Sequence, residues 1–420
     1  MIACTNRQNT ERLDFYRGIF DHYGSMGDST GIAVLGYDVF RFAFGAFFIA
    51  VHGALMVGIL LEFLRDRRTR ALVLTKEALV SLVIPVHNET SRIGPLLESL
   101  MAQDYPHLEF VFIDDRSNDG TMALLEDFGK AVSAKAKAEG FEWTVHLMSL
   151  SYNPGPNFKQ YALGKGIGEA KGSLILLTDA DCRVPSTWVR GLAVRMEDAR
   201  IGAMVGPVFK IMEADRFLDR FQAFDHAIRY TYIAGTTGIG SPGGSFGNNM
   251  IVRREALDAI GGYEGVPYSV TEDAALISQI RSHSSFTLRV GIGLDVHVMT
   301  QSEPDWRSFV KQTLRWNNGG LYCPDLGTRL NYNYLMVSIA LGMLAIPVLP
   351  FVPSLWPLPA SVFLAMTLNT IATLRLARSS LPDIGLAYIA QTIFMPIYMA
   401  YLTVLGYLGA KSTWKGKTLS

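Results

Sequence analysis

A long apolar run near the amino terminus constrains this chain more than any other feature. Residues 42–61, FAFGAFFIAVHGALMVGILL, contain no charged side chain, and about twenty such residues can cross a bilayer as a helix. Four arginines follow between residues 65 and 70. Since basic residues stay on the cytoplasmic side of a span, we predict a transmembrane helix over residues 37–64 and a cytoplasmic location for the domain after it. A buried core helix, the alternative, explains the length and the one-sided arginines less well.

A second apolar zone covers residues 330–410, with about three candidate spans near residues 334–353, 358–376 and 385–408. Three crossings would carry the carboxyl terminus outside, whereas the basic tail, residues 411–420, favours the inside. The sequence therefore leaves the number of crossings open, because one segment could instead lie in the interface or re-enter.

Composition and cysteine usage narrow the class of protein. Hydrophobic residues make up 49% of the chain and the mean hydropathy is +0.20, which is high for a protein without membrane segments. The 38 basic and 38 acidic side chains cancel, so the overall charge predicts no nucleic-acid partner. Three widely spaced cysteines argue against a disulfide framework and a structural zinc. The amino-terminal segment, residues 1–36, lacks the pattern of a secretory signal.

The stretch between the apolar zones, residues 80–320, alternates short apolar runs with helical stretches. This alternation predicts one cytoplasmic α/β domain on a mostly parallel sheet. The predicted strands are residues 79–85, 108–114, 144–150, 173–179 and 202–208.

Acidic side chains follow three of these predicted strands. PVHNE ends the first, DDRSNDGT ends the second, and Asp179 and Asp181 end the fourth. In open α/β sheets ligands bind beyond the carboxyl ends of the strands, so we expect these carboxylates at one rim. Two carboxylates one residue apart can hold Mg²⁺ or Mn²⁺, which commonly also bind substrate phosphates. Helix capping could explain each strand end by itself, but not all three together.

Six motifs occur in an order that resembles the family-two inverting glycosyltransferases. They are SLVIPVHNE, FIDDRSNDGT, LLTDADCRVP, FGNNMIVRREALDAIGGY, VTEDAALISQI and QTLRW. The resemblance covers roughly residues 80–320 and implies the A-type nucleotide-sugar-binding fold, a mostly parallel Rossmann-like sheet. Membrane-anchored members of that family often have flanking spans like those predicted for this chain.

The resemblance also assigns residues to the nucleotide-sugar donor. It implies that Glu89 and Asp115 lie around the nucleoside and that Pro85 shapes the first turn, while Asp114 is structural. Lys159 stands in a loop, NPGPNFKQYALGKGI, that leads into a helix near the nucleotide in the family. A solvated lysine at a helix start is the equally weighted alternative for Lys159.

The D-x-D motif of the family matches Asp179 and Asp181. The resemblance implies that Asp181 is the more direct ligand of Mg²⁺ or Mn²⁺, with Asp179 also near the metal and closer to the ribose or sugar. The ion would stabilise the charge that develops on the leaving nucleoside diphosphate. The alternative, two aspartates that cap a helix starting near Pro185, does not account for the other motifs.

The TED motif, residues 271–273, matches the catalytic acidic motif of the family. Asp273 would be the general base that takes the proton of the acceptor hydroxyl, in a single displacement with inversion. A carboxylate suits this role if burial or neighbouring acids raise its pKa. Thr271 and Glu272 also fit an ordinary helix start.

The remaining motifs are assigned to the acceptor and the diphosphate. Gln312, Arg315 and Trp316 form Q-x-x-R-W, in which Arg315 would pair with phosphate oxygens and Trp316 would offer a flat surface to a sugar. The alternative is a helix at the membrane interface. Asn248 and Asn249 follow a glycine-rich stretch and are assigned to the donor sugar or the acceptor, and Glu272 of the TED motif is assigned to the acceptor or the diphosphate.

The sequence thus predicts an integral membrane enzyme, placed in a bacterial inner membrane, that transfers a hexose from a nucleotide sugar, with UDP-sugars favoured, to a lipid or glycan hydroxyl. A processive polysaccharide synthase is the main alternative, because complete TED and Q-x-x-R-W motifs are typical of such enzymes. A non-catalytic nucleotide-sugar-binding membrane protein is a second alternative. A dinucleotide oxidoreductase is disfavoured because G-x-G-x-x-G does not follow the first strand. No pattern in the sequence encodes the donor sugar, the acceptor or the oligomeric state.

Overall fold

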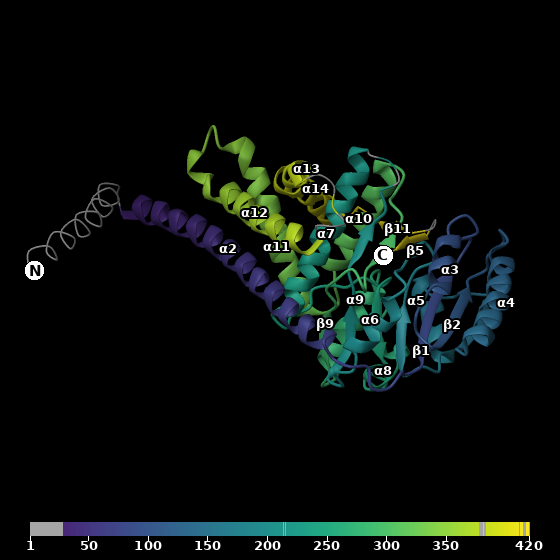
Figure 1. The fold of residues 1–420 in the computed structure, drawn as a ribbon. Helices are drawn as coiled ribbons and strands as arrows, with labels where there is room; N and C mark the ends of the chain where they lie inside the picture. The colour runs from purple at the N-terminus through teal and green to yellow at the C-terminus, as the bar shows by residue number, and fades with distance from the viewer. Residues whose placement is uncertain are drawn as a thin grey trace, which may run out of the picture.

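The computed structural model describes residues 28–212, 214, 216–377, 381, 384–410, 412–414 and 417–419. An α/β domain lies at one end of the molecule, the long helix α2 (Asp28–Arg70) leads away from it, and a group of carboxyl-terminal helices packs beside α2 (Figure 1). Most of the predicted amino-terminal segment, residues 1–27, and the lysine side chains of the predicted basic tail lie outside the described residues.

A seven-stranded sheet forms the centre of the α/β domain within the described residues. In pairing order its strands are β3 (Glu142–Ser149), β2 (His107–Asp114), β1 (Val80–Val86), β4 (Leu174–Leu177), β8 (Met250–Arg253), β6 (Ile201–Val205) and β9 (Thr287–Val290). The five predicted strands are confirmed. β8 was not predicted, and it runs antiparallel to both β4 and β6, so the sheet is mostly but not wholly parallel.

Helices cover both faces of this sheet, which explains why the strands are nearly continuous apolar runs. In β1, Leu82 and Ile84 belong to one buried cluster and Val83 belongs to the other. The helices around the sheet are α3 (Gly94–Met101), α4 (Thr121–Glu139), α5 (Phe158–Glu169), α6 (Trp188–Arg195), α8 (Arg254–Asp258) and α9 (Glu272–His283), with the 3₁₀ turn η1 (Tyr263–Gly265). A small second sheet consists of β5 (Cys182–Arg183), β10 (Val298–Thr300) and β7 (Val208–Lys210).

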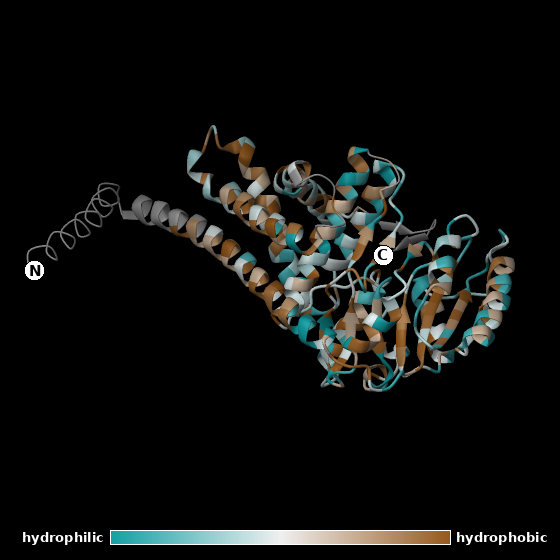
Figure 2. Ribbon diagram, in the orientation of Figure 1, coloured by the Kyte–Doolittle hydropathy of each residue, from teal (hydrophilic) through white to brown (hydrophobic). Residues whose placement is uncertain are grey.

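Three helical stretches of the described chain are long and apolar enough to cross a membrane: Phe42–Arg70, Leu326–Val348 and Pro353–Ala377. They consist of part of α2, of α11 (Leu326–Ala345) with η2 (Ile346–Val348), and of η3 (Pro353–Leu355) with α12 (Pro357–Ala377). Hydrophobic residues, in brown, run along α2 and through the sheet (Figure 2).

The third apolar segment, predicted over residues 385–408, folds differently. It divides into α13 (Ile384–Ile389), the π-helix η5 (Ala390–Phe394) and α14 (Met395–Tyr407). α14 packs against α10 (Trp306–Leu321), where Asn317 Nδ2 donates to the carbonyl of Leu402 at 3.2 Å. The terminal hairpin, β11 (Ser412–Trp414) and β12 (Lys417–Leu419), comes next, and β11 also contacts α10. The end of the described chain therefore returns to the α/β domain.

Helix α7 (Phe217–Gly238) lies between the sheet and α2, and most of its side chains are buried. α2 and α7 meet through glycines. A Cβ atom on Gly58 would overlap the carbonyl of Gly235, and one on Gly238 would overlap the carbonyl of Gly58. Glycine permits this approach because it has no side chain, and the two helices therefore contact each other backbone to backbone.

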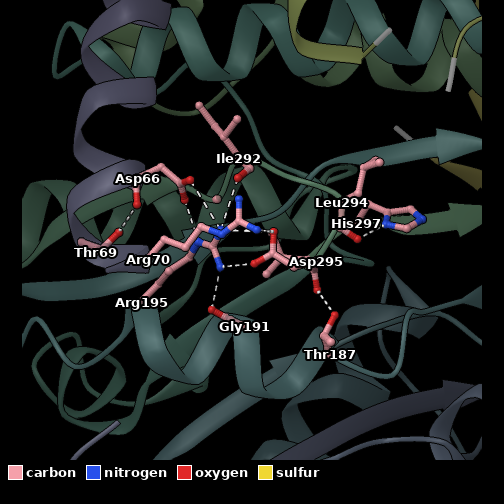
Figure 3. A network of polar contacts seen from close by, with 12 residues as sticks. Asp66, Thr69, Arg70, Thr187, Gly191, Arg195, Ile292, Leu294, Asp295 and His297 are labelled. Atoms are coloured by element: carbon pink, nitrogen blue, oxygen red, sulfur yellow. Dashed lines mark hydrogen bonds and ion pairs between the residues drawn. The ribbon is translucent and has the colours of Figure 1, made fainter. Parts of the chain in front are cut away.

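A buried arginine connects the last turns of α2 to the α/β domain through ion pairs and hydrogen bonds (Figure 3). Arg195, at the end of α6, is 0% exposed. Its guanidinium donates to Asp66 of α2 at 2.6 Å and to Asp295 at 2.8 Å, and also to the carbonyls of Gly191 and Ile292. A charge this deeply buried requires such partners, because desolvation is costly.

A second acidic residue of α2 makes a similar contact one turn earlier. Glu62 is 0% exposed and accepts a hydrogen bond from the backbone N–H of Val290 in β9 at 3.1 Å. Arg65 pairs with Glu62 at 2.7 Å and donates to the carbonyl of Gly238. The final turns of α2 therefore belong to the α/β domain, although they continue the apolar helix.

Replacing Arg195 tests this junction. We expect Arg195→Met to lower the free energy of unfolding by about 3–5 kcal/mol, because the buried Asp66 would lose its cation and Asp295 would keep only its longer contact with Arg70, at 3.4 Å. The matched control is Arg200→Met, since that side chain is 82% exposed and pairs only at the surface with Asp198; it should change stability by no more than about 0.5 kcal/mol. Thermal unfolding of both variants in detergent measures the difference, and equal melting temperatures would contradict the expectation.

Candidate active site

A cavity of about 350 Å³ lies beyond the carboxyl ends of β1, β2 and β4, where α5, α7, α9 and α10 converge. This is the edge at which ligands bind in open α/β sheets. Twelve of the residues singled out from the sequence line it: Pro85, Glu89, Asp115, Lys159, Asp179, Asp181, Asn248, Glu272, Asp273, Gln312, Arg315 and Trp316. Residues from 85 to 316 in the chain therefore share one site.

The first two strand ends form one side of the cavity. Asp115 accepts from Asn153 Nδ2 at 3.0 Å and from Arg116 Nε at 2.8 Å. Arg116 has a left-handed backbone, φ 63°, and its guanidinium lies over the ring of Phe158. Asp114 instead accepts from the N–H of Ser117 at 3.3 Å and does not line the cavity. Only the second aspartate of the pair faces the cavity.

The D-x-D segment forms the adjoining wall between β4 and β5. Helix α6 begins at Trp188 with Thr187 as its N-cap, so Asp179 and Asp181 do not cap it. Burial, followed by the charge of Asp179, raises the pKa of Asp181. Two partly buried carboxylates one residue apart repel each other, and a cation between them would relieve that repulsion.

Lys159 joins this wall to the TED motif. Its ammonium lies 2.7 Å from Asp179 Oδ1 and 3.4 Å from Glu272 Oε1. Burial acts to lower the pKa of Lys159, but these carboxylates outweigh it and the pKa is raised. Asn157 caps α5 through the N–H of Lys159 and donates to Glu272 Oε2 at 3.1 Å. Lys159 is therefore an internal cation of the site and not a solvated lysine.

The donor set determines how a metal ion could bind. Among the described residues, no three His, Cys, Asp or Glu side chains are grouped closely enough to hold an ion. Asp179 and Asp181 supply two oxygen ligands, which fits Mg²⁺ or Mn²⁺, since Mg²⁺ usually takes one or two carboxylates and completes its shell with water and substrate phosphates. The residues thus fit an ion that binds together with a diphosphate.

Asp273 lies in α9 directly after Glu272. Its carboxylate accepts from the N–H of Gly247 at 2.8 Å and from its neighbour Ala274 at 2.9 Å. Burial and then the charge of Glu272 raise the pKa of Asp273 to about 6, while Lys159 acts in the opposite direction. A carboxylate with this pKa is a stronger base than an exposed one and is still ionised at neutral pH.

Helix α10 brings the Q-x-x-R-W motif over the cavity. Gln312 Nε2 donates to Glu303 at 2.8 Å, and the buried Gln312 Oε1 has no hydrogen-bond partner in the part of the chain described. Arg315 donates a long hydrogen bond, 3.5 Å, to the carbonyl of Val270, and its guanidinium lies 6.0 Å from the ring centre of Trp316. Trp316 packs edge-on against His226, with their ring centres 5.3 Å apart. Gln312 and Arg315 thus retain hydrogen-bonding capacity for a ligand.

The two asparagines of the glycine-rich segment have different positions. Asn248 lines the cavity. Asn249 is 0% exposed, donates to the carbonyls of Pro207 and Val296, and accepts from Trp188 Nε1. The assignment of Asn249 to a sugar or acceptor is therefore corrected: its hydrogen bonds support the backbone behind the site.

Several cavity residues were missed from the sequence. Lys210 ends β7 beside Asp181, and burial lowers its pKa. His226 and Arg229 come from α7; burial keeps the pKa of His226 well below its usual value, so this imidazole is neutral. A polar stripe at Gln222, His226 and Arg229, with helical spacing, was the available indication. In the sequence this stripe is indistinguishable from the solvated face of an ordinary amphipathic helix, so it did not indicate a site.

Comparison with known proteins identifies the class and then the family. The cavity and its motifs are those of a nucleotide-sugar-dependent glycosyltransferase. The family model of glycosyl transferase family 21 matches residues 45–420, and the chain belongs to that family. The resemblance to inverting enzymes of family two therefore identified the correct class of protein.

Relatives of this chain include the probable glycosyltransferase YdaM of Bacillus subtilis, 26% identical over 58% of this chain and 55% of the relative. The beta-monoglucosyldiacylglycerol synthase of Synechocystis is 26% identical over 57% of this chain and 47% of the relative. An undecaprenyl-phosphate 4-deoxy-4-formamido-L-arabinose transferase of Aeromonas hydrophila is 34% identical over 26% of this chain and 30% of the relative. The chain spans about half the length of the first two.

Among solved structures, a mannosyltransferase of Pyrobaculum calidifontis in complex with GDP-Man and Mn²⁺ is similar to this chain, with 19% identity and a TM-score of 0.48. The match covers 87% of this chain and 99% of that one. TarS 1–349 of S. aureus in complex with UDP has 13% identity and a TM-score of 0.38, over 81% of this chain and 95% of that one.

The pKa of Asp273 leads to a test by pH. If this carboxylate must be ionised to accept a proton, the rate of sugar transfer should fall as the pH decreases through about 6, the pKa of Asp273. Lys159→Gln should move this acid limb to higher pH, because the charge of Lys159 lowers the pKa of Asp273. Lys165→Gln, an exposed position of the same helix, should leave the limb unchanged. A pH–rate profile that stays flat through this range would contradict the assignment.

Proposed function

We propose that this glycosyltransferase takes a sugar from a nucleotide sugar, with UDP-sugars favoured, and transfers it with inversion to a lipid hydroxyl at the cytoplasmic membrane face. The observation that carries this proposal is the single cavity shared by the D-x-D carboxylates, a half-buried Asp273 with raised pKa, and the Q-x-x-R-W helix. The groups suited to hold the leaving diphosphate and the group suited to take the acceptor proton thus lie in the same cavity.

In the proposed reaction, Asp273 accepts the proton of the acceptor hydroxyl as the oxygen attacks the anomeric carbon. The bond from that carbon to the diphosphate breaks, and the nucleoside diphosphate leaves on the opposite face. A divalent ion, when bound by Asp179 and Asp181, stabilises the charge that the leaving group acquires. Arg315 is suited to pair with the same phosphate oxygens, and Glu89 and Asp115 are assigned to the nucleoside.

Two features favour a lipid acceptor over a soluble glycan. Three helical stretches of the described chain could span a membrane, and Glu62 and Asp66 attach the first directly to the α/β domain. The relatives of the chain include a synthase whose name gives a diacylglycerol product and a transferase whose name gives undecaprenyl phosphate. The cytoplasmic location rests on the arginines after the first apolar run.

Processive polymer synthesis stays the second candidate, because the TED and Q-x-x-R-W motifs are both complete. The two activities differ in their products. Purified membranes given UDP- and GDP-sugars and a total lipid extract should release nucleoside diphosphate and yield a lipid heavier by one sugar. A ladder of sugar increments would favour the synthase. Nucleotide binding without any release of nucleoside diphosphate would contradict both activities.

Removal of the metal tests the role proposed for the D-x-D pair. A chelator should abolish transfer, and Mg²⁺ or Mn²⁺ should restore it. Asp181→Ala should weaken both binding of the donor and transfer, because one of the two oxygen ligands is lost. Calorimetric titration of nucleoside diphosphate, with and without the ion, measures the first effect. Unchanged affinity in the presence of metal would contradict the assignment.

A second substitution separates the base from donor binding. Asp273→Asn keeps the shape of the side chain but cannot accept the proton, so transfer should fall by about 100- to 10,000-fold while nucleotide affinity is kept. Asp127→Asn is the control, since Asp127 lies on the surface with a side chain 72% exposed. Normal transfer by Asp273→Asn would exclude Asp273 as the base.

A further inference from the structure

A second cavity, of about 70 Å³, lies among helices α2, α7, α11, α12 and α14. Three of these helices, α2, α11 and α12, contain the candidate membrane spans. Apolar side chains dominate its lining, and four of them are methionines: Met56, Met336, Met366 and Met399. Methionine is flexible and polarisable, so a wall rich in it adapts to apolar ligands of irregular shape.

The second cavity shares a wall with the candidate active site. Arg229, Tyr232 and Tyr332 line both. Arg229 is held by Asp225, with Nε 2.7 Å from Oδ2. The hydroxyl oxygen of Tyr232 is buried and has no hydrogen-bond partner among the residues described. A buried hydroxyl without a partner is costly, and a polar ligand group at this boundary would remove that cost.

The lining residues of α2 show how far the second cavity lies from the contact between α2 and the sheet. His52, Leu55 and Met56 line it, whereas Glu62 is bonded to Val290 of the α/β domain. At 1.5 Å of rise per residue, the cavity therefore lies about 9–15 Å along α2 from the first contact with the sheet, on the side of the apolar run. The cavity therefore lies beside the uncharged run of residues 42–61, which an aliphatic chain would contact if this run crosses a bilayer.

We propose that this cavity binds an aliphatic chain of the acceptor lipid, and that Tyr232 and Arg229 hold the polar end of the same lipid as it enters the active site. This inference rests on the proposed function, since it assumes that the acceptor is a lipid. The main support for this inference is the wall that the two cavities share, Arg229, Tyr232 and Tyr332. An amphipathic molecule that occupied both cavities would lie against these three residues. The apolar wall would receive the chain, and the cavity with Asp273 would receive the hydroxyl.

Filling the cavity tests the proposal. Met366 is buried in α12 and lines the cavity, whereas Leu364, two residues earlier, is 48% exposed. We expect Met366→Trp to lower transfer to a total lipid extract by tenfold or more, and Leu364→Trp to transfer like the wild type. Native mass spectrometry of protein extracted from its own membranes should find one lipid on the wild type and on Leu364→Trp, and none on Met366→Trp.

Folding is checked independently of lipid. Nucleoside diphosphate should raise the melting temperature of Met366→Trp as it does for the wild type. If Met366→Trp does not fold, Met336→Phe fills the same cavity from α11 with a smaller change in volume, and Leu341→Phe, at an exposed position of the same helix, is its control. Met336→Phe should likewise lower both transfer and lipid retention.

The two proposals can fail separately. If sugar reaches lipid and the cavity-filling variants transfer and retain lipid like the wild type, the cavity is not the chain site although the proposed function stands. If the wild type carries a lipid that the variants lose, but no donor gives a glycosylated lipid, the cavity does bind a lipid chain, while the proposed function and the assignment of that lipid as acceptor both fail. A wild type that retains no lipid, together with normal transfer by the variants, also overturns the chain site.

Discussion

The guanidinium of Arg195 is the contact on which the arrangement of helix and domain depends. It has no exposed surface and neutralises Asp66 of α2 and Asp295 of the α/β domain at once. Both carboxylates come from distant parts of the chain, so this charge cluster can form only when α2 is seated on the domain. The cavity bounded by His52, Leu55 and Met56 exists only in that arrangement. The ion pairs of Arg195, which lie outside the candidate active site, thus help to fix the position of the apolar helix α2 relative to that site.

The candidate active site is organised around a second internal cation. Lys159 contacts Asp179 of the D-x-D segment and Glu272 of the TED motif, so the segment assigned to the donor and the motif that contains Asp273 share one positive charge. Binding of a divalent ion near Asp179 would compete with this ammonium. The charge around Asp273 would then change when the donor binds, which links the basicity of that carboxylate to occupancy of the site.

The sequence predicted the sheet well because its strands are short apolar runs, buried on both faces and bounded by polar ends. It predicted the motif residues of the cavity because carboxyl ends of neighbouring parallel strands must meet. Other features depend on packing that no local pattern records. β8 could not be recognised because MIVR is too short to show a strand period, and Asn249 looked like a ligand residue although it supports backbone carbonyls. His226 and Arg229 were missed because a polar stripe on a helix is usually solvated, and only the fold reveals that this one lines a cavity.

The glycine contact between α2 and α7 has a consequence for movement. Gly58, Gly235 and Gly238 leave no side chain between the two backbones, so neither helix can approach, roll or slide without a collision of main-chain atoms. The α/β domain and this part of α2 should therefore move as one rigid unit. Around the second cavity, α11, α12 and α14 meet α2 and α7 through side chains, including the four methionines. We therefore expect an opening that admits a bulky substrate to arise where these carboxyl-terminal helices line the second cavity, and not between α2 and α7.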